Sequence, residues 1–378
     1  MRPKTLLALL GVLVVVAALA FSPLQNIFAR QLARGPQAAV QPLPAETVLP
    51  VATPTTAARS TPAPTPTPTP EPTATVAPTA TPAIVRSALA GRTWLTIYGR
   101  GFEAGPILGR LANYKNLDDM AAEVGPWMQE IKKYNGGKEV VPVIHLIYGM
   151  ATPCEADGNC LFYLDSAGVD VVETYIKPAA ARGWQVILDT QIGKSTPELE
   201  VERMIKKGYL DYPNVHVAFD PEFHVYPGED LPGIPIGQVD SSDINAAQKM
   251  LNDLVAEKHL AAKKVLIVHQ FGDPEVNDGN PFMITDKKAT KTYDNVDLVF
   301  DADGFGGPVS KVHKYDLMTN AEVYPFIKFR GIKLFFFNPH EERHHGDTPV
   351  MTWAQVFGKE DVGTNVRMNT MPDVVVIA

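Results

Sequence analysis

The sequence predicts an α/β protein in which residues 84–378 fold as a (β/α)8 TIM-like barrel. Eight apolar segments rich in β-branched and aromatic residues recur there, and one helix-like stretch separates most neighbouring pairs. Carboxylates and histidines collect at the C-terminal ends of these segments, where the loops of such barrels carry the chemistry. Nothing follows the eighth segment, so we expect the last outer helix to be missing. The predicted strands are residues 94–98, 140–148, 184–189, 215–220, 265–271, 296–301, 333–338 and 373–377.

Helix signals fill most of the intervals between the predicted strands. Asn116 precedes two aspartates and is expected to cap a helix that runs toward Tyr134. Thr196 and Pro197 have the N-cap and N1 pattern of another helix start. Further helices are expected at residues 169–182, 242–259, 283–293 and 308–322, with a weak one at 352–357.

The first 35 residues have the composition of a signal peptide or a membrane anchor. Arg2 and Lys4 precede an apolar run at residues 6–21, and Ala18-Leu19-Ala20 offers a small-residue cleavage site. Residues 5–21 are at the short limit for spanning about 30 Å of hydrocarbon, so cleavage and anchoring both stay open. Either alternative predicts an exported protein, extracellular or at the cell surface, with the membrane as a partner if the segment is kept.

Residues 36–83 are predicted to form a disordered stalk. They contain 13 Pro, 12 Thr and three charged residues, so they cannot bury enough apolar surface to offset the entropy of ordering. Proline restricts the backbone to an extended polyproline-like spacer, which suits a stalk that crosses a cell wall. A merely tolerated linker is the alternative.

The net charge of the chain is −8. Residues 1–83 contain five basic and two acidic residues, a net charge of +3, so residues 84–378 carry −11. An acidic domain without basic clusters excludes nucleic acid as the expected partner. The chain has two cysteines, Cys154 and Cys160, separated by five residues. An even number at short range in an exported chain predicts a disulfide.

Asp220-Pro221-Glu222 is the strongest candidate for catalysis. Alternation along the fourth strand assigns Val215, Val217 and Phe219 to the helix-facing side, and His216, Ala218, Asp220 and Glu222 to the barrel axis. Two carboxylates at one strand end influence each other's pKa, so one can stay protonated as an acid while the other stays ionised. Acetal cleavage needs that combination.

Further polar residues arrive at the ends of the other strands. A ring of acids, amides and aromatics suits a polyhydroxylated ligand, whose hydroxyls need both donors and acceptors. For each residue alone, the alternative is a side chain satisfied by a loop amide. The expected substrate-binding residues are Tyr98, Arg100, Glu103, Asp189, Gln191, His269, Gln270, Asp301 and Asp303.

Two other motifs lack the helix that their usual function requires. His340-Glu341-Glu342-Arg343-His344 has the His-Glu-x-x-His spacing of zinc proteases, but Pro339, Gly346 and Pro349 limit the required helix to at most two turns with no apolar face to bury. A histidine-rich surface loop with an incidental metal site is the alternative. Gly99-Arg-Gly101-Phe-Glu-Ala104 has dinucleotide-binding spacing, but Pro106 and Gly109 interrupt the required helix.

The placement of Asp220-x-Glu222 at strand four, with Phe300-Asp-Ala-Asp-Gly-Phe-Gly at strand six, resembles exported glycoside-hydrolase barrels such as family-18 chitinases and family-25 lysozymes. In the chitinases an Asp-x-x-Asp-x-Asp-x-Glu run closes strand four. The resemblance implies that Glu222 is the proton donor and Asp220 its neighbouring helper. Ala218 and Val215 stand where that run has its two earlier aspartates, a departure that puts chitin in doubt as the substrate.

The sequence therefore suggests an exported glycoside-hydrolase-like protein that acts on cell-surface or extracellular polysaccharide. A non-catalytic carbohydrate-binding or wall-organising barrel is the rival. A metallohydrolase would need two or three ligands from different strands to meet at one ion. Neither a cofactor nor a metal is predicted.

Overall fold

The computed structural model describes residues 85–104, 109–154, 158–271, 283–336 and 346–378. They belong to one compact unit, Pro78–Ala378. The predicted N-terminal segment, the stalk and the histidine-rich sequence 340–345 lie outside these residues. None of the described helices combines the length and apolar composition needed to cross a lipid bilayer.

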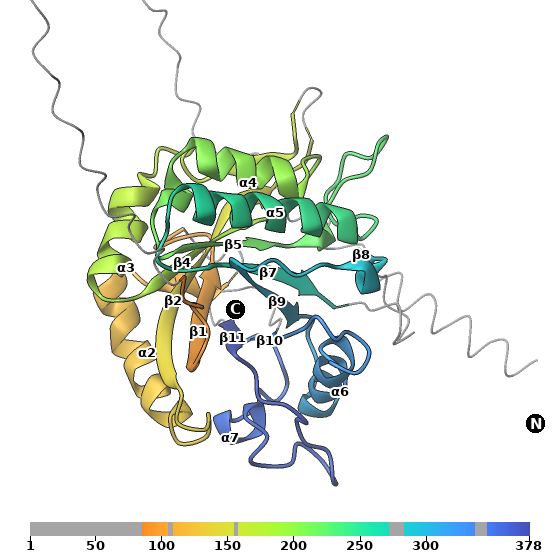
Figure 1. Cartoon of the computed structure of the whole chain (residues 1–378). Coiled ribbons are helices and arrows are strands. Elements are labelled where there is room, and N and C mark those ends of the chain that lie inside the picture. The colour runs from red at the N-terminus through yellow and green to blue at the C-terminus, as the bar shows by residue number, and fades with distance from the viewer. Residues whose placement is uncertain (1–84, 105–108, 155–157, 272–282, 337–345) are drawn as a thin grey trace, which may run out of the picture. The chain divides into compact units, whose positions relative to one another are not determined.

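Eight parallel strands close into a barrel, as the sequence predicts (Figure 1). The circle closes because β1 pairs with β11 on one side and with β2 on the other. A short strand, β3 (Leu161–Tyr163), adds to β2 in antiparallel orientation, and β6 (Val239–Asp240) pairs with β8 (Ile284–Thr285) in a separate two-stranded sheet. In spatial order the barrel strands are β1 (Arg92–Gly99), β2 (Glu139–Ala151), β4 (Gln185–Thr190), β5 (Val215–Phe219), β7 (Lys264–Gln270), β9 (Val296–Ala302), β10 (Phe329–Leu334) and β11 (Val374–Ile377).

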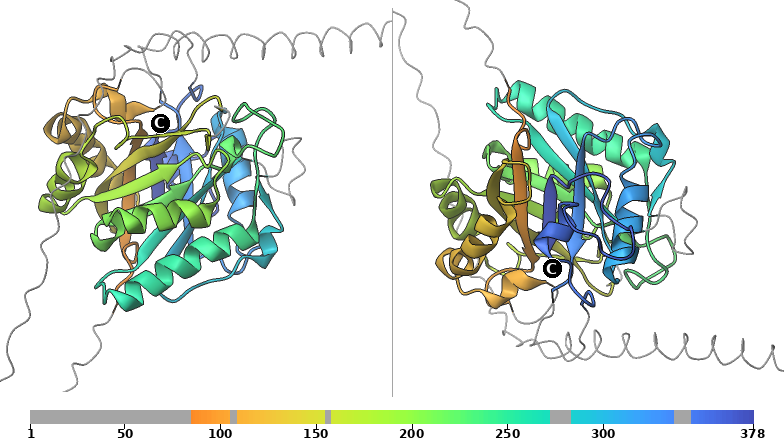
Figure 2. Two further views of the ribbon diagram at one scale, coloured as in Figure 1. Left: turned by 90° about the horizontal axis from the view of Figure 1, so that it is seen from above. Right: turned by 90° about the horizontal axis from the view of Figure 1, so that it is seen from below.

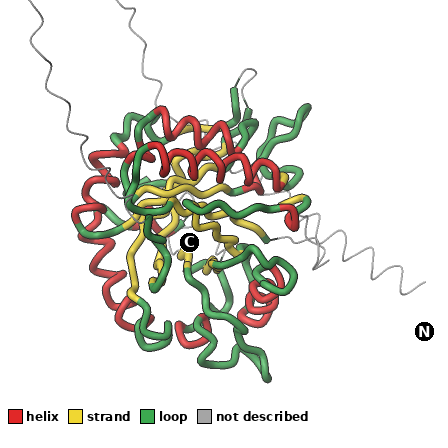
Figure 3. The backbone as a smooth tube through the Cα atoms, viewed as in Figure 1, coloured by secondary structure: helices red, strands yellow, loops and turns green. Residues whose placement is uncertain are grey.

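Helices surround the strands (Figures 2 and 3). Asn116 accepts from two backbone N–H groups at the start of α2, and Thr196 caps α4 with Pro197 as its first residue, as the sequence predicts. A π-helical turn at Val172–Ile176 precedes α3. The α-helices are α2 (Leu117–Ile131), α3 (Lys177–Ala181), α4 (Pro197–Lys206), α5 (Ser241–Glu257), α6 (Pro308–Met318) and α7 (Trp353–Val356). Short 3-10 turns lie at Arg110–Asn113, Tyr209–Asp211, Pro221–Phe223 and Lys287–Ala289.

Two elements differ from the prediction. The helix expected at residues 283–293 is wrong: this stretch forms β8 and the Lys287–Ala289 turn, with Asp286 between them in the left-handed region. The seventh barrel strand begins at Phe329, four residues before the predicted start. Arg330 interrupts the apolar pattern in the part of the strand that precedes the predicted start.

Alternation divides the buried residues into two clusters. Val215, Val217 and Phe219 belong to the cluster between strands and helices, whereas Ala218 belongs to the cluster inside the barrel. His216 lies on the inner face, where its ring contacts Trp94 at 4.9 Å. The predicted assignment of faces is therefore confirmed for this strand. Apolar residues fill the N-terminal half of the interior: Trp94, Val141, Val143, Ile187, Val265, Ile267, Val299, Val374 and Val376 are among them.

The disulfide between Cys154 and Cys160 is present, as predicted. It closes the loop that follows β2. The backbone N–H of Cys154 donates to the carbonyl of Asp230, which joins this loop to the segment after β5. The crosslink therefore stabilises the side of the barrel where the strands end.

Candidate functional site

The barrel interior changes from apolar to polar toward the C-terminal ends of the strands. Ile187 is followed two residues later by Asp189, Ile267 by His269, and Val299 by Asp301, so each pair points inward from the same strand. We call this C-terminal half of the interior the polar layer. Its side chains belong to residues at most 4% exposed: Thr96, Tyr98, His145, Asp189, His269, Asp301 and Lys333.

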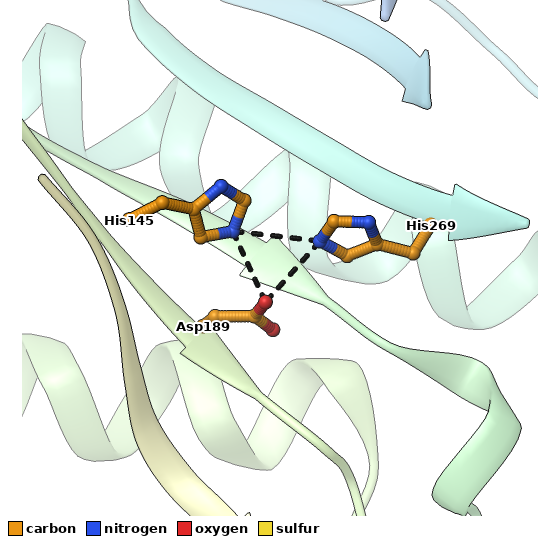
Figure 4. A group of neighbouring side chains, drawn as sticks. All are labelled: His145, Asp189 and His269. Carbon is orange, nitrogen blue, oxygen red and sulfur yellow. Dashed lines mark hydrogen bonds and ion pairs between the residues drawn. The ribbon is translucent and has the colours of Figure 1, made fainter. Parts of the chain in front are cut away.

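His145, Asp189 and His269 converge from three strands at the centre of the polar layer (Figure 4). Asp189 Oδ2 lies 3.0 Å from His145 Nε2 and 3.2 Å from His269 Nε2. The two Nε2 atoms are 3.4 Å apart. One carboxylate oxygen and two imidazole nitrogens therefore surround a single point, and their three residues have no exposed surface.

A second group of contacts fixes His269 from its other side. Its Nδ1 lies 2.8 Å from Asp301 Oδ2 and 3.5 Å from Asp303 Oδ2. Lys333 Nζ donates to Asp303 Oδ2 over 2.8 Å and lies 4.0 Å from the centre of the Tyr98 ring. The lysine, the two aspartates and the histidine thus form one continuous buried network.

Electrostatics in this network follow from its charges. Burial lowers the pKa of His145 despite its bond to Asp189. For His269, burial and Lys333 act in the same direction, but the bonds to Asp189 and Asp301 outweigh them and raise the pKa to about 10. Burial opposes the charged form of Lys333, yet the carboxylates around it raise its pKa. The His269 ring therefore lies between two carboxylates that favour its charged form.

The predicted catalytic pair stands beside the network. Asp220 follows β5 directly and is 3% exposed, and Glu222 is half-buried in the short turn after it. Burial, then the charges of Asp220 and Asp303, raise the pKa of Glu222. Burial is also the main reason for the raised pKa of Asp220, which His269 and Lys333 partly offset. Both carboxyl groups are thus held closer to neutrality than in water.

Four of the predicted substrate-binding residues are placed outside the network. Arg100 donates to the carbonyls of Ile147, Tyr148 and Phe162, so its guanidinium fastens β2 to β3. The Gln191 side chain accepts from the backbone N–H of Ala151. Glu103 is exposed, and Gln270 follows the inward-pointing His269 and so faces the helix side. The remaining five predicted binding residues, Tyr98, Asp189, His269, Asp301 and Asp303, lie together.

Sequence reasoning missed three residues of the polar layer, Thr96, His145 and Lys333. The two ionisable ones carried a signal: His145 interrupts an apolar run on β2, and Lys333 lies within an apolar segment on β10. A polar residue at an inward position of a buried strand is costly unless it has a partner. The same cost, considered for every predicted strand, predicts a site role for His145 and Lys333.

Several buried carboxylate oxygens have no hydrogen-bond partner among the described residues. Asp189 Oδ1, Asp220 Oδ1 and Asp301 Oδ1 lie in or beside the polar layer, and Glu200 Oε2 lies away from it on α4. Buried polar atoms are normally paired, so unpaired acceptors point to a missing donor, a water molecule or a cation. The polar layer has the composition of a place that receives a ligand or ion.

The chain matches no protein-family model and no curated protein. What is established is a closed parallel (β/α) barrel with a buried acidic and histidine-containing centre at the C-terminal ends of its strands.

Proposed function

We propose that the protein is a glycoside-hydrolase-like enzyme that acts on polysaccharide outside the cell, with Glu222 as proton donor and Asp220 as its partner. The observation that carries the proposal is the raised pKa of both carboxyl groups at the end of a single barrel strand. A carboxylic acid that stays protonated near neutral pH is what a glycosidic oxygen needs to leave.

In the proposed reaction the two groups have different tasks. Glu222 gives its proton to the leaving oxygen as the glycosidic bond breaks. A water molecule then adds to the anomeric carbon and gives a proton back to the Glu222 carboxylate. The positive charges of His269 and Lys333 favour the ionised form of Asp220. Its carboxylate then stabilises the positive charge that develops on the sugar ring. The difference between their environments assigns the roles, because the cations favour the ionised form of Asp220.

The polar layer would form the floor beneath the sugar. Asp189, His269 and Asp301 are fully buried, which favours support of the reacting groups over direct contact with substrate. Tyr98 and Asp303 lie next to Lys333 and keep slight exposure, so they are the better candidates for contact. Export is part of the same proposal. It is supported by the apolar N-terminal sequence, the Pro/Thr-rich stretch and the disulfide.

The test is to incubate the full chain with a panel of cell-wall and extracellular glycans and to measure hydrolysis as the release of reducing ends. Glu222→Gln should lower turnover by about 100- to 10,000-fold, the usual contribution of a general acid, with an unchanged circular dichroism spectrum. Glu229→Gln, in the segment that follows, is the matched control and should keep full activity. If Glu222→Gln hydrolyses glycans as fast as the native chain, the assignment is wrong.

The near-complete burial of Asp220 favours a second candidate, a carbohydrate-binding barrel without turnover. Such a protein would retain a glycan on an array and release no reducing ends from it. The same panel therefore separates the two functions.

A further inference from the structure

We propose that His145, Asp189 and His269 form a binding site for one divalent transition-metal ion, Zn²⁺ in the first place, at the centre of the polar layer. The proposal concerns binding alone and does not depend on the hydrolase activity proposed above. It is argued from donor geometry, ligand chemistry, buried charge and unpaired atoms.

The spacing of the three donor atoms fits a metal ion. They are 3.0, 3.2 and 3.4 Å apart, so they lie on a circle of about 1.9 Å radius. An ion about 0.9 Å out of their plane would then be about 2.0–2.1 Å from all three, the usual zinc–nitrogen and zinc–oxygen distance. Tetrahedral zinc ligands at this distance are about 3.3 Å apart, close to the observed separations.

The ligand set is one that transition metals use. Two imidazoles and one carboxylate hold catalytic zinc in several enzymes and leave a coordination position open. The ligands come from β2, β4 and β7, so rigid strands position each of them. His269 also places its Nδ1 2.8 Å from Asp301, the carboxylate–histidine arrangement that orients metal-bound imidazoles.

Charge gives an independent reason. Carboxylates outnumber cations when Asp220 and Asp303 are counted with the polar layer, and Lys311 nearby already pairs with Asp347 at 3.2 Å. Burial of excess charge of one sign is costly unless a counter-ion is present. Four buried aspartates, Asp189, Asp220, Asp301 and Asp303, thus face two groups that can carry positive charge, Lys333 and His269.

The other buried barrel histidine shows what a purely structural one looks like. His216 has both ring nitrogens engaged: Nε2 lies 3.0 Å from the Gln185 side-chain oxygen, and Nδ1 accepts from the backbone N–H of Val265. In contrast, His145 and His269 turn their Nε2 atoms toward each other and share one acceptor, while Asp189 Oδ1 is left without a hydrogen-bond partner among the described residues. Hydrogen bonding alone explains His216 well and the shared point between His145 and His269 poorly.

The experiment is calorimetric titration of the chelator-stripped full chain with Zn²⁺. A variant with His340, His344 and His345 changed to alanine serves as the background, because those histidines offer a separate site. We expect one ion per chain, and we expect Mg²⁺, which prefers oxygen ligands, not to compete. His145→Gln and Asp189→Asn should each weaken binding by about 100-fold or more, and His216→Gln is the matched control that should not.

A second measurement needs no variant at the site and therefore does not depend on its folding. Nitrogen chemical shifts of the nine histidines can be followed in the native chain during titration. Stoichiometric Zn²⁺ should move the Nε2 signals of two histidines with tight-binding behaviour and raise the melting temperature. Absence of stoichiometric binding to the stripped native chain, or binding lost entirely in the triple-alanine background, would overturn the proposal.

Discussion

Lys333 is the cation on which the polar layer depends, and its removal gives the sharpest test of the electrostatic reasoning. Its side chain is 5% exposed, and Nζ lies 2.8 Å from Asp303 Oδ2, whose own side chain is 7% exposed. Lys333→Met keeps much of the length and apolar stem while it removes the charge. Asp303 then loses its bonded cation and stays buried.

The expected cost is about 3–5 kcal/mol of unfolding free energy at pH 7, the range found when one partner of a buried ion pair is removed. No discount for solvent screening applies, because both partners are nearly inaccessible. The loss of the Lys333 contact with the Tyr98 ring adds to this cost. A variant with both charges removed, Lys333→Met with Asp303→Asn, should be more stable than the sum of the two single changes predicts.

The pH dependence has a definite sign. The pKa of Asp303 is lowered in the folded chain, where Lys333 and His269 outweigh burial, so its contribution is present above the unfolded value of about 3.9 and is lost as pH falls through the folded pKa. The pKa of Lys333 is raised, so its contribution is present below about 10.4 and is lost as pH rises through the folded pKa. The stability gap between native chain and variant should therefore be widest between about pH 4 and pH 10.

Urea unfolding followed by circular dichroism measures the gap. Lys264→Met is the matched control: this lysine is also buried, but it donates to the carbonyls of Tyr212 and Val215 and pairs with no carboxylate among the described residues. Burial lowers its pKa to about 7. Its substitution should cost about 1–3 kcal/mol, the usual cost of leaving buried acceptors without a donor. The reasoning is refuted if Lys333→Met and Asp303→Asn combine additively within about 0.5 kcal/mol.

Three further predictions follow from local features. If Glu222 is the acid, its raised pKa predicts that turnover persists at neutral pH and is lost on the alkaline side, where the carboxyl group deprotonates; a pH–rate profile that already falls near pH 4 would contradict this. Gly331→Ala places a Cβ atom 2.7 Å from Asp301 Oδ1 and should cost about 1–3 kcal/mol in urea unfolding, whereas Gly125→Ala, inside α2 where the space is open, should stabilise by about 0.5–1 kcal/mol. Changing Cys154 and Cys160 to serine should lower the unfolding free energy by about 2–3 kcal/mol, and a reducing agent should then have no additional effect.

Most of the fold could be predicted because its determinants are local or periodic. Asn116 and Thr196 cap helices through their own side chains, and the alternation at Val217 and Ala218 follows from strand geometry. The predicted start of β10 is late because Arg330 is polar in sequence, and Lys333 is not predicted as a site residue; both acquire their partners only in the folded chain. A local pattern does not contain those partners.

The site was predictable as a place and only partly as a set of residues. Strand ends converge in any such barrel, which is why Asp189, His269 and Asp301 were found. The distinction between His269 and its neighbour Gln270 depends on which face of the strand points into the barrel. The sequence analysis predicts those faces only for the strand at residues 215–220. His145 lies in the middle of β2, whereas the predicted site residues lie at the ends of strands or in the loops that follow them.

The contrast between the two halves of the barrel interior indicates that folding stability alone does not account for the polar layer. The same strands that supply Asp189, His269 and Asp301 supply Ile187, Ile267 and Val299 two residues earlier, and there the interior packs with apolar side chains. Apolar residues would therefore close the C-terminal half as well, without the cost of burying four aspartates. Replacement of buried ion pairs by well-packed apolar residues is often neutral or stabilising, so stability alone does not explain this half of the barrel. Buried ionisable groups with perturbed pKa values gather at functional sites, and this composition is what the proposed proton transfer and ion binding would require.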